Sequence, residues 1–371
     1  MNISPKDPHL RILFALGGCV AMTIILVLMF GFEIDTDNKQ HETVGFIILG
    51  DINEAGWNAS HYNGIKAACD KFGIKLLVRD NVKENSAQCV PAIKGLIDEG
   101  VGMIFLTSYF YATEAKETID NYPNIAFATN SAEVHSRNIT SCFARMYQGR
   151  YLCGALAGMK TKSNVIGYVA AMPNNSEVCR GINAFTLGVQ RTNPKAKVLV
   201  MWTGDWENEQ VEAEHTRRLI KQAGADVLTY HQDEATVANV AEELGVDFIA
   251  YNAILDGYSE HYLTSLVCRW DLFYQDIIQR YLKGELSSLK NHWVGVQEGT
   301  IVLSDYSAAV TPEMQEKIES LKQELVNGKF IFQGPLYDNK GNLQCAEGDV
   351  ISDRTLLERI NWLVKGVEIL E

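Results

Sequence analysis

The sequence predicts an α/β protein with two doubly wound parallel-sheet lobes, joined by a hinge, separated by a cleft and preceded by an N-terminal membrane helix. Two observations predict this fold class. One long apolar segment without any charge lies near the N-terminus. After it, short apolar stretches alternate with stretches of helical spacing, and this pattern runs through twice. Alternation of this kind indicates βαβ units, whose parallel sheets carry helices on both faces.

The composition is that of a folded protein long enough for two ordinary domains. The chain has 371 residues, of which 47% are hydrophobic and 21% are charged. It carries 33 basic and 46 acidic residues, a net charge of −13. Because such a charge repels phosphate backbones, the composition gives no reason to expect nucleic-acid binding. We expect the partners to be small molecules or proteins.

The apolar segment at residues 12–32, ILFALGGCVAMTIILVLMFGF, predicts a membrane anchor. As a helix it would span about 31 Å, enough to cross the hydrocarbon core of a bilayer. Basic residues precede it and acidic residues follow it, so the positive-inside rule places residues 1–11 in the cytoplasm. We therefore expect a polar tether at 33–43 and a body at 44–371 on the periplasmic or cell-surface side of the membrane.

Two other interpretations of this segment stay open. The run LGGC ending at Cys19 could be a lipoprotein cleavage site, but most of the apolar stretch follows the cysteine instead of preceding it. A cleaved signal peptide would have a shorter apolar core and a small-residue cleavage site, and no clear site follows residue 32. An uncleaved anchor is favoured. Beyond Cys19 we expect buried thiols, because the remaining cysteines show no dense or metal-binding spacing.

The two α/β units follow from the order of apolar and helical stretches. Strands of the first unit are expected at 44–49, 74–78, 103–106 and 125–128. Its helices are expected at 58–72, 86–99 and 113–121. The pattern restarts at Asn164, with strands expected at 165–170, 197–201, 226–230 and 247–251. Helices of this second unit are expected at 178–190, 207–223 and 236–244.

The lobe boundaries follow from where the pattern restarts. We expect lobe 1 to comprise about 44–160 and 255–300, and lobe 2 about 161–254 and 301–371. The strand LTSLV and the helix at 271–282 are expected to cross back to the first lobe. No boundary is rich in Pro or Ser, so the sequence favours hinge strands over a flexible linker.

Candidate binding residues gather at the predicted strand ends, where open parallel sheets bind their ligands. Trp57 and Trp206 supply flat faces that would sandwich a ligand between the lobes. The other candidates are Asn58, Tyr109, Asn130, Arg180, Asp233, Asn252, Trp270 and Asp271. Aromatic faces with amides and carboxylates suit a flat heterocycle, which stacks on the rings and bonds through its edge.

Simpler structural roles remain open for several of these residues. Tyr109 and Trp270 are as well suited to packing between loops as to binding. Arg180 has two open roles, contact with a ligand oxygen or pairing with a carboxylate, whereas Arg145 is expected to form a salt bridge. His231 is expected to face water at the end of its strand.

No enzyme signature stands out. The run GALAGMKT at 154–161 resembles a phosphate-binding loop but lacks the adjacent Gly-Lys-Thr. No nucleophile elbow, zinc-binding H-E-x-x-H or dinucleotide fingerprint occurs. We therefore expect a binding protein that is not an enzyme and has no catalytic residues, metal or cofactor.

Several runs of the sequence resemble the basic membrane protein family of ABC-transporter substrate-binding proteins, which includes bacterial purine nucleoside receptors. These runs are GWNASHYNGIKAA, NITSCFARMYQGRYLCGALAGMKTKSNVIGYVAA, RGINAFTLGVQRTNP, KQAGADVL and LTSLVCRWD. Their order and spacing match from about Thr43 to the C-terminus. The resemblance implies a periplasmic-binding-protein type I fold that captures a purine base or nucleoside between its lobes. It also implies an ABC permease and ATPase as partners.

The resemblance assigns roles to four of the candidates. In the family's motif an aromatic residue and an asparagine follow the first strand, and here these are Trp57 and Asn58. The second aromatic residue, in the other lobe, corresponds to Trp206. Asn130 takes the position that reads the edge of the base.

Two departures from the family pattern bear on the ligand. Nucleoside-binding members tend to carry an aspartate in place of Asn252 and a lysine in the LTS segment, where this chain has Cys268 and Arg269. Both family residues would hold ribose hydroxyls. Their absence leads to the hypothesis that the ligand is a free nucleobase. A membrane-anchored sensory ectodomain that reports purine-like ligands to a partner membrane protein is the alternative to an importer's receptor, because both would use the same cleft.

Overall fold

The structure of the protein, a computed structural model, describes residues 43–53, 57–130, 134, 136–286 and 292–371. The expected cytoplasmic tail, the membrane segment at 12–32 and the tether up to residue 42 lie outside these residues. Within the described part of the chain, no helix is long and apolar enough to cross a membrane.

Six parallel strands form the first sheet, and both of its faces are buried. Their order is β11 (His292–Val294), β5 (Ile139–Ala144), β4 (Ala126–Thr129), β3 (Met103–Leu106), β1 (Thr43–Ile47) and β2 (Lys75–Arg79). One face is covered by α2 (Trp57–Phe72) and α10 (Trp270–Leu282), the other by α3 (Ser86–Asp98), α4 (Tyr111–Glu114) and α5 (Lys116–Asn121). Because strand side chains alternate, Phe46 and its neighbour Ile47 enter different cores.

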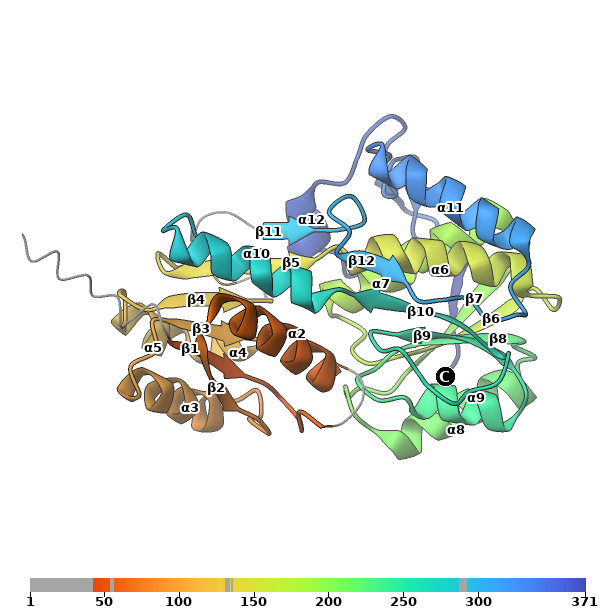
Figure 1. Ribbon diagram of the computed structural model, residues 1–371. Helices are drawn as coiled ribbons and strands as arrows, with labels where there is room; N and C mark the ends of the chain where they lie inside the picture. Colours follow the sequence, from red (N-terminus) through yellow and green to blue (C-terminus); the bar gives the residue numbers. More distant parts are fainter. Residues whose placement is uncertain (1–42, 54–56, 131–133, 135, 287–291) are drawn as a thin grey trace, which may run out of the picture.

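Seven strands form the second sheet, all parallel except β12, which is antiparallel to β10. Their order is β12 (Ile301–Leu303), β10 (Tyr262–Cys268), β9 (Asp247–Tyr251), β8 (Val227–His231), β6 (Val165–Ala170), β7 (Lys197–Trp202) and β15 (Val367–Ile369). The flanking helices are α6 (Met146–Lys160), α7 (Ser176–Thr192), α8 (Glu209–Lys221) and α9 (Thr236–Glu243). Figure 1 shows α6 and α7 on one side of this sheet and α8 and α9 on the other.

The C-terminal part of the chain packs on the helices of the second sheet. Helix α11 (Pro312–Val326) contacts α6, and α12 (Asp353–Glu358) contacts α7. Between them lies a short antiparallel pair, β13 (Leu336–Tyr337) and β14 (Leu343–Cys345).

The strands and helices expected from periodicity in the two α/β units are confirmed, with three differences. The helix expected at 113–121 is interrupted at Ala115 and forms α4 and α5. Strand β5 and helix α6 were not expected as elements, although their residues carried the family resemblance. The expectation that LTSLV crosses to the first lobe is wrong: this strand, β10, pairs with β9 in the second sheet, and only α10 after it packs against α2.

Helices α6 and α7 pack unusually closely, and glycines make this possible. A Cβ added to Gly154 would lie 1.9 Å from the backbone oxygen of Phe185, and one added to Gly188 would lie 2.0 Å from that of Tyr151. The run GALAGMKT therefore lies within α6, where its glycines admit a neighbouring backbone instead of a phosphate group. All seven cysteines of the described residues are free and buried, as the sequence predicted.

Three short segments connect the two sheets and are joined by hydrogen bonds. They run from β5 to α6 through Arg145, from β10 to α10 through Arg269, and from β11 to β12 through residues 295–300. The backbone N–H of Arg145 donates to Val294 at 2.6 Å, and that of Arg269 donates to Thr300 at 2.7 Å. The third segment thus bonds to both of the others. As predicted, Arg145 also forms a salt bridge, at 2.5 Å to Asp353.

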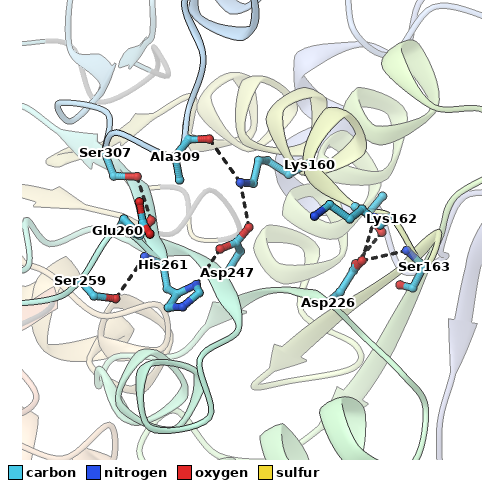
Figure 2. A network of polar contacts seen from close by, with 11 residues as sticks. Lys160, Lys162, Ser163, Asp226, Asp247, Ser259, Glu260, His261, Ser307 and Ala309 are labelled. Carbon is cyan, nitrogen blue, oxygen red and sulfur yellow. Dashed lines mark hydrogen bonds and ion pairs between the residues drawn. The ribbon is translucent and has the colours of Figure 1, made fainter.

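A polar network fastens the amino ends of strands β8 and β9 to the end of helix α6 (Figure 2). Lys160 forms an ion pair with Asp247 at 2.9 Å and donates to the backbone oxygen of Ala309 at 3.2 Å. Asp226 accepts hydrogen bonds from the backbone N–H groups of Lys162 at 2.7 Å and Ser163 at 2.8 Å. This network lies at the edge of the sheet opposite its carboxyl ends and closes the turn after α6.

The first prediction concerns Asp226. Burial of this carboxyl opposes its ionisation, but its hydrogen bonds with Thr161, Ser163 and Lys162 outweigh burial and lower the pKa. The substitution Asp226→Asn should therefore reduce the free energy of unfolding by about 2 kcal/mol at pH 7. Because the folded-state pKa is depressed, this stabilisation is present above the unfolded pKa of about 3.9 and is lost as the pH falls through the folded pKa.

Urea denaturation of the wild type and the variant between pH 3 and pH 7 measures this difference. Asp70→Asn is the matched control, because Asp70 belongs to an exposed pair with Lys66 that should contribute less than about 1 kcal/mol. An Asp226→Asn variant as stable as the wild type at pH 7 would contradict the role given to the network.

Candidate functional site

A pocket lies where the carboxyl ends of the two sheets meet. It offers about 400 Å³ of space between protein atoms, a volume that includes its open mouth. The first sheet's side contributes Trp57, Thr107, Ser108, Tyr109 and Asn130. The second contributes Glu177, Trp206, His231, Asp233 and Tyr251. Every one of these residues ends a strand or follows one, as the topology of parallel sheets requires.

Trp57 is held at the first residue of α2 by contacts on several sides. Its indole Nε1–H donates to the backbone oxygen of Thr107 at 3.2 Å. Its ring centroid lies 4.1 Å from that of His61 and 5.5 Å, edge to face, from that of Trp270. The half-buried indole therefore has one side fixed in the first lobe while it also lines the pocket.

Trp206 is held on the loop after β7 by a tight turn. Gly204 adopts a positive φ of 77°, and the Asp205 carboxylate accepts the Trp206 backbone N–H at 2.8 Å. The Trp206 backbone oxygen accepts the N–H of Asp233 at 3.1 Å. The indole is half-buried, and its centroid lies 6.2 Å from that of His231. Two indoles, one from each side, thus line the same pocket.

The amide of Asn130 shares an acceptor with Trp57. Its Nδ2–H donates to the backbone oxygen of Thr107 at 3.1 Å, the same atom that accepts the indole N–H. One carbonyl at the end of β3 therefore orients both an aromatic face and an amide of the first lobe. Tyr109 lies on the loop after β3, and its ring centroid is 5.1 Å from that of Phe110.

Carboxyl groups are concentrated on the second lobe's side. Glu177 lies in the first turn of α7, whose N-cap Asn175 accepts the Glu177 backbone N–H at 2.8 Å. Oε1 of Glu177 lies 3.7 Å from Nε2 of His231. Burial raises the pKa of Asp233 well above its usual value, and the nearby carboxylates of Glu207 and Glu177 raise it further.

His231 is buried, so the expectation that it faces water is wrong. It is the last residue of β8, and its ring packs 4.6 Å from that of Tyr251. Burial lowers the pKa of His231 to about 4, although the nearby carboxylate of Glu177 partly offsets this. The imidazole is therefore neutral at pH 7.

Tyr251 closes the inner end of the pocket. It is 4% exposed, and its hydroxyl has no hydrogen-bond partner among the residues that the structure describes. The guanidinium of Arg150 lies 3.8 Å from the centroid of its ring, a cation–π arrangement. Arg150 is itself buried and donates to the Thr229 hydroxyl at 3.4 Å.

Five of the ten candidate residues from the sequence line this pocket: Trp57, Tyr109, Asn130, Trp206 and Asp233. The other five do not. Two of them, Asn58 and Trp270, instead contact other residues of the first lobe. The side-chain oxygen of Asn58 accepts the backbone N–H of Gly50 at 3.3 Å. Trp270 is 2% exposed, with its ring 3.7 Å from that of His61. A Cβ added to Gly64 would lie 2.4 Å from Cβ of Trp270, so this close packing depends on the glycine.

The remaining three candidates are held by other partners. Arg180 is buried and donates to the backbone oxygen of Leu356 at 2.7 Å, so neither of its two expected roles is seen. The side-chain oxygen of Asn252 accepts the indole N–H of Trp270 at 3.0 Å. Asp271 forms a surface ion pair with Arg269 at 2.8 Å.

The sequence analysis missed five lining residues: Thr107, Ser108, Glu177, His231 and Tyr251. His231 and Tyr251 are the final residues of their strands, so a rule that counts the last strand residue as well as the loop would have found both. Glu177 follows an Asn-Ser helix start, where an acidic residue has the ordinary explanation of stabilising the helix. Nothing local distinguishes it from a structural residue.

The comparisons with known proteins agree with a binding pocket of this kind. Residues 41–335 match the family described as ABC transporter substrate-binding protein PnrA-like. A purine-binding protein of Brucella abortus is 29% identical over 329 residues, which cover 88% of this chain and 92% of that protein. A putative ABC transporter glucose-binding protein of Haloferax volcanii is 26% identical over 335 residues, covering 89% of this chain and 82% of that protein.

A solved structure resembles the fold. An ABC transporter solute-binding protein from Aeropyrum pernix has a TM-score of 0.67 and 17% sequence identity, over 78% of this chain and 92% of that one. At this identity the likeness concerns the fold alone. The expected α/β fold with parallel sheets is thus confirmed, and the family match covers most of the sequence. The chain belongs to the PnrA-like family of ABC transporter substrate-binding proteins.

Proposed function

We propose that this protein is the extracytoplasmic receptor of an ABC importer and that it captures a purine nucleobase between Trp57 and Trp206. The observation that carries the proposal is that one indole from each side lines a single pocket. The receptor would hand its ligand to a membrane permease driven by a cytoplasmic ATPase. Residues 12–32 would hold the body at the outer face of the membrane.

Stacking energies are large enough for such a receptor. A base stacked on an aromatic side chain gains about 1–3 kcal/mol. Two indoles would then supply about 2–6 kcal/mol of the roughly 8 kcal/mol that corresponds to a micromolar dissociation constant. Edge hydrogen bonds to Asn130 and Asp233 would supply much of the remainder.

The position of Asn252 supports a free base over a nucleoside. Its side-chain oxygen is engaged by Trp270, and Cys268 is 5% exposed at the end of β10. Neither residue lines the pocket, which favours a ligand that needs no ribose contacts at these two positions. The names of the two relatives point to purine and to glucose, and a sugar can also stack on indoles. The ligand panel must therefore separate three classes.

The second prediction tests the sandwich. Trp57→Ala and Trp206→Ala should each weaken purine binding by about tenfold to 100-fold, because each removes one stacking face. Trp57→Phe and Trp206→Phe keep a ring and should retain part of the affinity. Isothermal titration calorimetry on the body from residue 43, with folding checked by circular dichroism, gives these dissociation constants.

Trp362→Ala serves as the matched control, since this half-buried tryptophan does not line the pocket. Normal binding by a folded Trp57→Ala or Trp206→Ala variant would show that the assigned sandwich is wrong.

The third prediction concerns the ligand class. In a thermal-shift screen, purine bases should raise the melting temperature, because a ligand that binds only the native state stabilises it. Their ribosides and glucose should produce smaller shifts at equal concentration. Tight binding of ribosides without binding of bases would end the nucleobase hypothesis, and a shift with glucose alone would replace the purine proposal with a sugar receptor.

A further inference from the structure

Three carboxyl groups of the second lobe lie in or near the pocket. Glu177 and Asp233 line it. Glu207, next to Trp206, has a buried Oε1 without a hydrogen-bond partner among the described residues. A Cβ added to Gly50 would come within 3.1 Å of that oxygen, so the Glu207 carboxyl abuts the first lobe.

No cationic side chain balances these acids inside the pocket. The ten lining residues include neither lysine nor arginine, and their one histidine, His231, is neutral at pH 7. Arg150 packs against the ring of Tyr251, and Arg180 donates to the backbone oxygen of Leu356. Neither arginine lines the pocket. The lining of the pocket therefore carries carboxyl groups without a cationic side chain beside them.

A separate observation indicates that a ligand atom is needed. Tyr251 lines the pocket and is almost fully buried, and its hydroxyl has no hydrogen-bond partner within the described part of the chain. Buried polar groups in folded proteins are nearly always paired. A hydrogen-bond acceptor on a bound ligand would pair with the Tyr251 hydroxyl.

We propose that the pocket selects heterocycles by an edge with two adjacent N–H donors, such as N1–H and the 2-amino group of guanine, which Glu177 and Asp233 accept. Ligands with an oxo group in place of such a donor, and phosphorylated ligands, are rejected by the same two carboxylates. This inference rests on the proposed function and adds the chemical class of the ligand. It goes beyond the resemblance, which assigns base recognition to Asn130.

The selection follows from the geometry of charged hydrogen bonds. Two parallel N–H groups meet the two oxygens of a carboxylate, and bonds of this kind are about twice as strong as neutral ones. An oxo group at the same place would set a carbonyl lone pair against a carboxylate. Removing one acceptor from the favourable pair should weaken binding by about tenfold to 100-fold.

Proton exchange gives a second, independent readout. Burial and the carboxylates of Glu207, Glu177, Glu234 and Glu84 raise the pKa of Asp233 in the empty pocket. A donor edge favours the ionised carboxylate and so lowers this pKa. Binding of an aminopurine should therefore release a proton, and affinity should rise with pH through the raised pKa.

The fourth prediction compares matched ligands. In calorimetry at pH 7, guanine should bind at least about tenfold more tightly than xanthine, which carries an oxo group where guanine has an amino group. Glu177→Gln and Asp233→Asn should each weaken binding of guanine by about tenfold to 100-fold and narrow its preference over xanthine. Glu214→Gln, an exposed glutamate of α8, is the charge-matched control and should bind like the wild type.

Titration in buffers of different ionisation enthalpy should show proton release with guanine, and Asp233→Asn should abolish that release. Xanthine binding as tightly as guanine, proton uptake, or unchanged affinity in both carboxamide variants would overturn the inference while leaving a purine receptor in place. A protein that binds glucose but none of the purines would instead overturn the proposed function, and this inference with it.

Discussion

The connection between the two sheets is the constraint on which the rest of the molecule depends. Three segments pass between them, and the backbone N–H groups of Arg145 and Arg269 donate to the third segment at Val294 and Thr300. Such bonds fix the sheets at one edge, so that the carboxyl ends of both open onto the same space. Every residue that lines the pocket ends or follows a strand because of this arrangement.

The two sides contribute different chemistry to that space. The first lobe orients its contacts through one carbonyl, since the backbone oxygen of Thr107 accepts hydrogen bonds from both Trp57 and Asn130. The second lobe supplies the carboxyl groups Glu177 and Asp233. A ligand held between the indoles would be read along its edge mostly from the second lobe. In the proposed complex, the aromatic faces would supply affinity for flat ligands in general, and the polar groups would discriminate among them.

Several ionisable groups are buried near the pocket, and the fold accommodates them in different ways. Burial keeps the imidazole of His231 neutral, which avoids the cost of an isolated buried charge. The ring of Tyr251 offers its face to the guanidinium of Arg150 at 3.8 Å. Asp233 retains a raised pKa next to other acids. These groups lie around the binding space, where perturbed pKa values are commonest in proteins.

The sequence by itself determined the two α/β units and most strand and helix positions, because hydrophobic periodicity is a local property of the chain. It also identified Trp57 and Trp206 as residues that line one pocket. Only the tertiary structure decided that Trp270 packs against His61 in the core, and that Glu177 and Tyr251 face the pocket. Where a side chain points depends on neighbours that are distant in the sequence, such as Gly64, which admits Trp270 because it has no Cβ.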